Sequence, residues 1–212
     1  MAARKITRLE AQQKNPDRVS VFLDRTFAFG VHQDLVLEYG LHVGRMLDEA
    51  EQRELESKDE VLRAKSIALN YLAYKPRTER EIRTKLARGG FSEEVADAVV
   101  QRLYALHFLD DAAYAHTFVT GRFRNRGYGP ARIRGDLVKR GVDRHLIDEA
   151  IEGGLNPDET REVARAQAEK RWERLTSEPD VLKRRKKLSD FLLRRGFSYD
   201  TVREVVEAVS RE

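Results

Sequence analysis

The sequence predicts a mainly α fold in which three tandem three-helix repeats form an elongated curved array, preceded by a small extension of a β-meander and short helices. Three observations predict it. An apolar and glycine pattern over residues 82–100 recurs 51 residues later and again after a further 55. A segment before residue 30 has the β-branched and aromatic residues and the rough alternation of strands. A repeat of roughly 50 residues buries little core alone, so neighbouring repeats should pack on one another.

In the N-terminal segment, residues 4–30 predict about three antiparallel strands. Turn residues separate the strands at positions 15–17 (Asn-Pro-Asp) and at Asp24-Arg25. A short helix is expected from His32 to Tyr39, and a second turn or helix over residues 41–47. Such a small sheet is marginal alone, so we expect it to pack on the helices that follow.

Residues 48–60 hold seven acidic and two basic side chains. A charge run of this kind is typical of a solvated helix, here one that leads into the first repeat. An acidic surface that mimics or repels phosphate is the alternative.

The first repeat shows the punctuation of three helices. The first helix should end before Pro76, because proline lacks an amide donor and disfavours helix in the residue before it. The second should begin at Thr78, which forms a capping box with Glu81, and end at residues 89–90, both glycine. The third should begin at Ser92. The first helix carries its apolar residues at helical spacing: Val61, Ala64, Ala68, Tyr71 and Leu72.

The same pattern of an apolar pair, a glycine stop, an apolar residue, a polar cap and an apolar stripe occurs three times. In the first repeat it is Ile82, Leu86, Gly90, Phe91, Ser92, Val95, Ala96, Val99 and Val100. In the second it is Ile133, Leu137, Gly141, Val142, Asp143, Leu146, Ile147, Ala150 and Ile151. In the third it is Leu188, Leu192, Gly196, Phe197, Ser198, Thr201, Val202, Val205 and Val206. Only Thr201 breaks the apolar pattern.

The predicted organisation is therefore an extension over residues 1–58 and three repeats over residues 59–109, 110–155 and 156–212. Residues 127–130 (Gly-Tyr-Gly-Pro) should form the first turn of the middle repeat, with Pro130 at the first helical position. Asn156-Pro157 should open the last repeat in the same way. A charged insert at residues 183–187 is expected to precede the second helix of that repeat and to explain its longer spacing.

Basic side chains concentrate in the last two repeats. Between Thr120 and Arg144 there are eight bases and two acids, although the net charge of the whole chain is only +4. Such residues could bind phosphates or an acidic protein partner; a solvated face with charges that compensate helix C-termini is the alternative. The candidate binding residues are Arg122, Arg124, Arg126, Arg132, Arg134, Lys139, Arg140, Lys183, Arg184, Arg185, Lys186 and Lys187.

No catalytic, cofactor or metal signature stands out. The chain has no cysteine, and its five histidines have no metal-ligand spacing. The adjacent carboxylates Asp110 and Asp111 could be half of a two-metal site, but one of them is expected to cap the first helix of the middle repeat. The N-terminus lacks the apolar run of a signal peptide and no stretch is long enough to span a membrane, so we expect a cytoplasmic protein.

These residues resemble the RecX family of bacterial recombination regulators. The resemblance is carried by residues 82–111, with Leu86-x-x-x-Gly90-Phe91 and the closing LHFLDD, and by residues 126–142 (RGYGPARIRGDLVKRGV). The N-terminal residues 6–31 look like the extension of longer members. The family resemblance implies a curved array of three-helix repeats that binds the RecA filament in its groove and inhibits filament extension, ATP turnover, strand exchange and co-protease function. It implies no catalytic residue and no cofactor.

Two hypotheses follow. The first is a monomeric regulator of recombination and DNA repair, active in the SOS response, whose partner is the RecA filament, with single- or double-stranded DNA as a second candidate partner. The second is a direct DNA-binding protein that uses the basic helix–glycine turn–helix of the middle repeat, with residues 144–151 as the recognition helix. Asp148, Glu149 and Glu152 on that helix count against the second hypothesis. For the first, we expect Arg132→Glu combined with Lys139→Glu to weaken filament inhibition without unfolding the chain.

Overall fold

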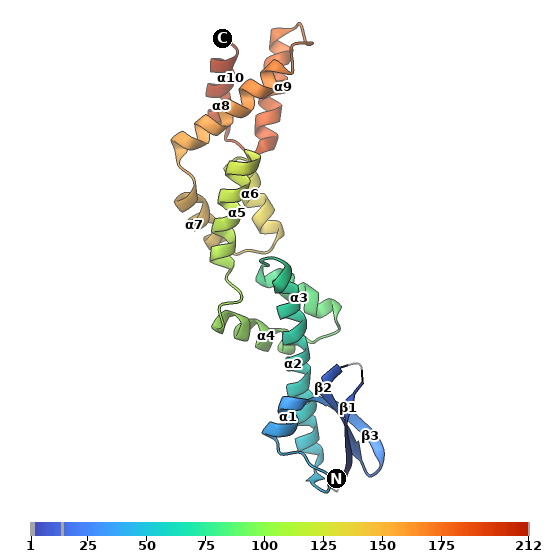
Figure 1. Cartoon of the computed structure of the whole chain (residues 1–212). Helices are drawn as coiled ribbons and strands as arrows, with labels where there is room; N and C mark the ends of the chain where they lie inside the picture. Colours follow the sequence, from blue (N-terminus) through green and yellow to red (C-terminus); the bar gives the residue numbers. More distant parts are fainter. Residues whose placement is uncertain (1–2, 14, 212) are drawn as a thin grey trace. The chain divides into compact units, whose positions relative to one another are not determined.

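The computed structural model describes residues 3–13 and 15–211, and within them it contains four strands and ten helices (Figure 1). In chain order these are β1 (Arg4–Gln12), β2 (Asn15–Leu23), β3 (Thr26–His32), α1 (Gln33–Glu38), β4 (Met46–Leu47), α2 (Glu49–Tyr74), α3 (Glu79–Arg88), α4 (Glu93–Ala105), α5 (Asp111–Arg126), α6 (Pro130–Lys139), α7 (Arg144–Gly154), α8 (Pro157–Glu173), α9 (Val181–Arg195) and α10 (Tyr199–Val209). The mainly helical fold with three three-helix domains is confirmed.

The chain forms two compact units. The first unit extends to Lys75 and resumes over Ile82–Phe108, so it holds the sheet, α1, α2, α4 and most of α3. The second unit holds Pro76–Glu81 and the chain from Leu109 onward, with α5 to α10. No helix in the described part of the chain has the length and apolar character of a membrane span.

The N-terminal sheet is antiparallel, with strand order β3-β2-β1-β4. The predicted three-stranded meander is confirmed, but one of its predicted turns is wrong. Residues 15–17 lie in β2 rather than in a turn, and Asn15 pairs with Gln12 of β1 before the register shifts to Ala11 with Val19. Residues 41–47 contain a turn at Val43 and Gly44, one of the two predicted alternatives, and then the short strand β4, which pairs with β1 and was not predicted.

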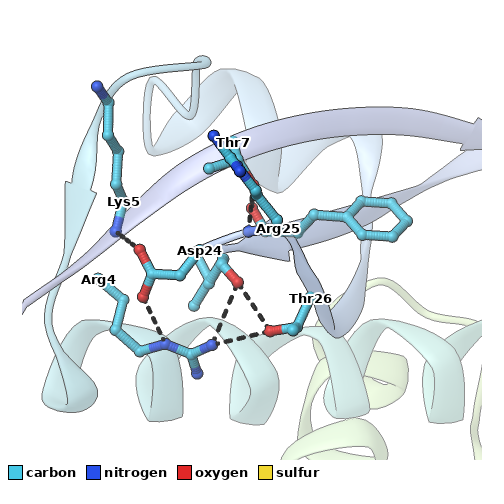
Figure 2. Close-up of polar contacts among 8 residues, drawn as sticks. Arg4, Lys5, Thr7, Asp24, Arg25 and Thr26 are labelled. Atoms are coloured by element: carbon cyan, nitrogen blue, oxygen red, sulfur yellow. Dashed lines mark hydrogen bonds and ion pairs between the residues drawn. The ribbon is translucent and has the colours of Figure 1, made fainter.

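The turn between β2 and β3 is fixed by polar contacts with β1 (Figure 2). Asp24 and Arg25 have positive φ angles of 49° and 69°, as a two-residue hairpin turn requires. The carboxylate of Asp24 accepts from the Arg4 guanidinium (3.2 Å) and from the Lys5 amide (3.1 Å), while the Arg25 amide donates to the Thr7 hydroxyl (2.9 Å). These contacts hold the turn against β1.

One face of the sheet packs on α1 and α2. The apolar core beneath it contains Ile6, Val21, Leu23, Phe29, Val31, Leu35, Leu41, Leu47 and Leu55. A buried ion pair closes one end, where Arg18 donates to both carboxylate oxygens of Asp59 (3.0 and 2.8 Å) and the His32 amide donates to the same carboxylate (2.8 Å). A pair of this kind is costly to break, because the remaining charge would have no partner.

The acidic segment does form a helix, as predicted, and it continues without interruption into the first repeat as α2. It is not solvated on every side, because Leu55 and Asp59 are buried against the sheet. The helix crosses residue 58, so the predicted limit between the extension and the first repeat falls within it.

The repeated helix pattern is confirmed in each copy. The paired apolar residues of α3, α6 and α9 are fully buried: Ile82, Leu86, Ile133, Leu137, Leu188 and Leu192. Gly90, Gly141 and Gly196 have positive φ angles of 83°, 77° and 90°. The predicted polar caps accept backbone amide protons at the starts of α4, α7 and α10: Ser92 from Val95, Asp143 from His145, and Ser198 from Thr201.

The remaining helix boundaries are also set by capping side chains, and one predicted boundary, the start of α9, is wrong. Asp110 caps α5, accepting from the Ala113 amide (2.8 Å), and Thr78 and Glu81 form the capping box of α3. The basic run at residues 183–187 lies inside α9 rather than before it, because Asp180 caps that helix three residues upstream of the run. The expected insert is therefore extra length at the start of α9.

A head-to-tail backbone contact joins the second and third repeats within the second unit. The Gly129 amide donates to the Arg195 carbonyl (2.8 Å), and the Ala131 amide donates to the Gly196 carbonyl (3.1 Å). A Cβ on Gly129 would lie 2.4 Å from the Gly196 carbonyl, and a Cβ on Gly196 would lie 2.3 Å from the Arg132 amide nitrogen. Both glycines are required by this close approach.

An equivalent contact occurs one repeat earlier, also within the second unit. The buried Thr78 hydroxyl donates to the Arg140 carbonyl (2.8 Å), and a Cβ on Gly141 would lie 2.1 Å from Cδ of Arg80. Asp111, which is 7% exposed, accepts from the Glu79 amide (2.9 Å), and burial raises the pKa of its carboxyl group. Asp111, the second aspartate of the Asp-Asp pair, therefore provides a hydrogen-bond acceptor for a backbone amide at the start of α3.

Candidate partner-binding surface

All twelve predicted binding residues lie in the second unit, and four of them, Arg122, Arg132, Arg140 and Arg184, lie over aromatic rings. The main group, here called the arginine–aromatic ladder, consists of Arg132, Tyr128, Arg195, Phe191 and Arg171. The guanidinium carbons of Arg132 and Arg195 lie 4.0 and 5.5 Å from the centre of the Tyr128 ring. Those of Arg195 and Arg171 lie 5.0 and 5.5 Å from the centre of the Phe191 ring. Cations and rings thus alternate across α6, α9 and α8.

The backbone fixes the ladder in place. Gly127 ends α5 in the left-handed conformation and Pro130 begins α6, so Tyr128 lies in the short turn between two helices. The Arg195 guanidinium donates to the carbonyls of Arg126 and Gly127. Arg132 donates to the Arg194 carbonyl (3.3 Å). Arg132 therefore supports the contact between α6 and α9 as well as presenting a charge.

The ladder is cationic and incompletely satisfied. Over the described residues, Arg132, Arg171 and Arg195 form no ion pair with a carboxylate, and Nε of Arg171 is buried without a hydrogen-bond partner. Arg171 and Arg195 are half-buried, so their charges are less screened than those of exposed side chains. A planar guanidinium in such a setting suits bidentate contact with a phosphate or carboxylate group.

A second group surrounds Phe118 in the middle repeat. The guanidinium carbons of Arg122 and Arg140 lie 4.9 and 4.8 Å from the ring centre. Arg140 also donates to the Asp136 carbonyl (2.9 Å). Burial raises the pKa of the neighbouring Tyr114 hydroxyl, and the charge of Arg140 partly opposes that rise. Arg122 and Arg140 are therefore held by packing.

The other predicted residues of the middle repeat differ in whether their charges are already paired with a carboxylate. Arg134 is paired with Asp148, and Arg124 lies 3.9 Å from a carboxylate oxygen of Glu159. The side chains of Arg126 and Lys139 are exposed and form no ion pair anywhere in the described chain. Arg126 and Lys139 are thus the residues of this repeat whose charges are available to a partner without loss of an internal contact.

The basic run in α9 divides into structural and free members. Arg184 packs 3.8 Å over the Trp172 ring and donates to the Trp172 carbonyl (2.8 Å). Lys183 lies 3.8 Å from Asp180. Lys187 is 2.5 Å from Glu178, and this hydrogen bond lowers the pKa of the Glu178 carboxyl group.

The remaining two members of the run line a groove. Arg185 and Lys186 border a shallow groove of about 240 Å³ between α9 and α10. Over the described residues, no hydrogen bond, ion pair or ring contact joins residues 183–187 to Arg132, Tyr128 or Arg195, so the two basic clusters predicted from the sequence are separate groups within the second unit.

Sequence reasoning missed two arginines of this surface, Arg171 and Arg195. A signal for Arg195 was present in the repeat register, which aligns Arg195-Gly196 with Arg140-Gly141. Arg171 had no such signal, because its role depends on Phe191 lying beside it across two helices. In the described residues, no three His, Cys, Asp or Glu side chains are grouped as metal ligands.

The helix–turn–helix of the middle repeat is present as α6 and α7, but its second helix is poorly suited to a DNA backbone. Ile147, Ala150 and Ile151 are buried, and the exposed side of α7 carries Glu149 and Glu152. Negative charges on a recognition helix repel phosphates.

Comparison with known proteins finds the same family along the whole chain. Family models match residues 4–48 (Regulatory protein RecX N-terminal domain), 64–103 (RecX, first three-helix domain), 110–151 (second three-helix domain) and 158–206 (third three-helix domain). A curated relative, Regulatory protein RecX of Clostridium acetobutylicum, is 33% identical over 98% of this chain and 97% of its own length. The Bacillus subtilis relative of the same name is 30% identical over 98% of this chain and 78% of its own length.

Two solved structures share the fold. A crystal structure of regulatory protein RecX matches with a TM-score of 0.79 and 30% identity, covering 99% of this chain and all (100%) of the other. The structure of RecX from Lactobacillus salivarius matches with a TM-score of 0.67 and 26% identity, covering 73% of this chain and 99% of the other.

Proposed function

The chain belongs to the RecX family of regulatory proteins, which are not enzymes, and from this premise we propose that it binds the RecA nucleoprotein filament and inhibits its activities. The activities concerned are filament extension, ATP hydrolysis and strand exchange. The observation that carries the proposal is the family match along the full length, with the three three-helix domains in order. Acting on a filament assembled on DNA, the protein would work in the cytoplasm.

The second unit supplies the surface that we assign to the filament. Its ladder arginines and the exposed Arg126 and Lys139 lack carboxylate partners within the described chain, so binding a partner would not require breaking internal ion pairs. A RecA filament offers both acidic protein groups and DNA phosphates, and either would be attracted to these cations. Rim cations of this kind act mainly on the association rate and make binding sensitive to salt.

The test is charge reversal at Arg126 and Lys139, because neither side chain takes part in packing. We expect Arg126→Glu combined with Lys139→Glu to weaken inhibition of the single-strand-dependent ATPase of RecA by at least about fivefold, since two reversed charges at an interface cost roughly 1–3 kcal/mol. Arg132→Glu, which the sequence suggested, is a less specific test of partner binding, because the Arg132 side chain also holds α6 against α9.

A matched control reverses two exposed arginines of the first unit that form no ion pair among the described residues, Arg88 and Arg102, with the same change in net charge. The control should inhibit as the natural chain does. Equal loss in both double variants would mean that net charge alone matters, and unchanged inhibition in both would remove Arg126 and Lys139 from the mechanism.

Direct DNA binding through α6 and α7 is the competing function. Tight, sequence-specific binding to naked duplex, together with no effect on RecA assembled on single strands, would establish it and end the present proposal. The acidic residues Glu149 and Glu152 on α7 argue for the opposite outcome.

A further inference from the structure

The outer face of the N-terminal sheet, which belongs to the first unit, carries exposed aromatic and cationic side chains. Phe27 on β3 is 60% exposed, and its ring meets that of Phe22 on β2 edge to face, with 5.9 Å between ring centres. The guanidinium of Arg8 on β1 lies 3.8 Å over the Phe22 ring. One cluster thus spans three neighbouring strands.

This cluster lies opposite the packed face. Ile6, Val21 and Phe29 point into the core beneath the sheet, and side chains alternate between the two faces of a strand. The bulges in the register of β1 with β2 and of β2 with β3 place Arg8, Phe22 and Phe27 together on the other side. The 60% exposure of Phe27 means that no described segment covers its ring.

The hairpin turn adds a cation at a conformational cost. Arg25 has a φ of 69°, a region that costs an ordinary residue about 1–2 kcal/mol and that glycine enters freely. Its backbone is held by the Thr7 hydroxyl, and its guanidinium forms no hydrogen bond or ion pair in the part of the chain that the structure describes (Figure 2). The side chain of this strained arginine therefore makes no polar contact among the described residues, and its charge is free for a ligand.

Cations outnumber unpaired carboxylates on this face. Figure 2 shows the Lys5 side chain extending away from the turn, and its amine is likewise unpaired over the residues described. Asp24 is paired with Arg4 (3.2 Å) and Glu10 with Arg8 (3.2 Å), so neither carboxylate is free to repel an anion. The face thus combines an exposed ring with free positive charges at its edge.

We propose that this sheet face binds single-stranded nucleic acid, with a base stacked on Phe27 and backbone phosphates held by Arg25 and Lys5. An exposed aromatic ring flanked by cations is the arrangement that binds unpaired bases without sequence preference. An acidic peptide would satisfy the cations but would leave the ring without a flat partner. A duplex would satisfy the cations but could not offer an unpaired base.

The experiment measures fluorescence anisotropy of labelled oligothymidylate and oligouridylate of about 16 nucleotides with the full chain, because sheet domains of this size cover roughly 4–16 nucleotides. Phe27→Ala should weaken binding by about fivefold or more, since loss of one stacked base costs about 1–3 kcal/mol. Arg25→Gly should lower the slope of log affinity against log salt by about 0.7, the contribution of one phosphate contact on a single strand. Its thermal unfolding midpoint should not fall, because glycine relieves the strained φ.

The controls match each change in chemistry and location. Leu37→Ala removes another large apolar side chain, 80% exposed on α1, and Arg53→Ala removes another exposed arginine, on α2. Both should bind as the natural chain does. The whole series is repeated in the Arg126→Glu, Lys139→Glu background, which separates the sheet from the second unit.

Unchanged binding in Phe27→Ala and Arg25→Gly, equal losses in the controls, or a duplex bound as tightly as the single strand would each overturn the proposal. Comparison of the two oligonucleotides shows whether the ligand is DNA or RNA. RecA inhibition is measured separately on the same variants, so the sheet site and the proposed function fail independently.

Discussion

Alanine at Gly129 should destabilise the second unit through a steric contact alone. Gly129 has φ −78° and ψ 165°, which alanine adopts without strain. An added Cβ would, however, lie 2.4 Å from the carbonyl carbon and oxygen of Gly196 and 2.6 Å from the Phe197 amide nitrogen. These are backbone atoms, so only a shift of α6 away from α9 can relieve the clash.

The cost follows from what that shift would break. Two hydrogen bonds, from Gly129 to Arg195 (2.8 Å) and from Ala131 to Gly196 (3.1 Å), would lengthen. Each contributes about 0.5–1.5 kcal/mol net, and overpacking adds about 1–3 kcal/mol, so we expect a loss of roughly 2–6 kcal/mol. In a chain of this length 1 kcal/mol moves the unfolding midpoint by roughly 2–4 °C.

Gly135→Ala is the matched control within the same helix. A Cβ at Gly135 meets nothing within 4 Å, and alanine is favoured over glycine inside a helix by about 0.8–1.0 kcal/mol. Urea unfolding followed by circular dichroism and by fluorescence of Trp172, the single tryptophan, should therefore shift in opposite directions for the two variants. Equal midpoints for Gly129→Ala and Gly135→Ala would refute the inferred backbone contact.

Three further changes test the charged contacts. Asp59→Ala should cost about 3–5 kcal/mol in urea unfolding, because it leaves the Arg18 charge buried without its partner; a loss below 1 kcal/mol would contradict the buried pair. Burial raises the pKa of Asp111, so the folded state holds that proton more tightly and stability falls as pH rises from about 4 through the raised pKa. Asp111→Asn, whose amide oxygen can still accept a hydrogen bond, should therefore raise the thermal midpoint at neutral pH but give no gain below about pH 3.5; a constant gain at every pH would argue against the carboxylate charge as its source. Arg184→Ala should cost about 1–2 kcal/mol and change the tryptophan fluorescence, whereas Lys183→Ala should be nearly neutral; similar effects would show that the run acts only as a block of charge.

Much of the helical fold was predictable because its signals are local. A capping box needs only Thr78 and Glu81, three residues apart, and a helix stop needs only a glycine such as Gly196. These signals act over one or two turns, so the caps at Ser92 and Ser198 could be identified without knowing what packs against them.

The errors came from elements that depend on a distant partner. Residues 15–17 have the composition of a turn, yet they extend along β2, whose start is set by the pairing of Asn15 with Gln12 of β1. Met46 and Leu47 form a strand only because β1 lies beside them. The basic run was placed outside α9 because charge says nothing about whether a segment is helical, whereas the Asp180 cap does.

The sequence identified only some residues of the candidate binding surface. Composition identified the basic residues of the middle repeat, but it could not separate Arg134, which is neutralised by Asp148, from the unpaired Lys139. It also missed Arg195, whose place beside Arg132 depends on α9 meeting the start of α6.

The sequence by itself determined the number of repeats, the order of their helices and the residues that cap them, because periodicity and capping chemistry operate within a few residues. Tertiary structure alone decided which cations share a ring, which are already paired, and which glycines carry a backbone contact. Arg132 and the Arg194 carbonyl that it reaches are 62 residues apart in the chain, as are Thr78 and Arg140. A contact over that distance exists only after whole repeats have packed together, so no local pattern encodes it.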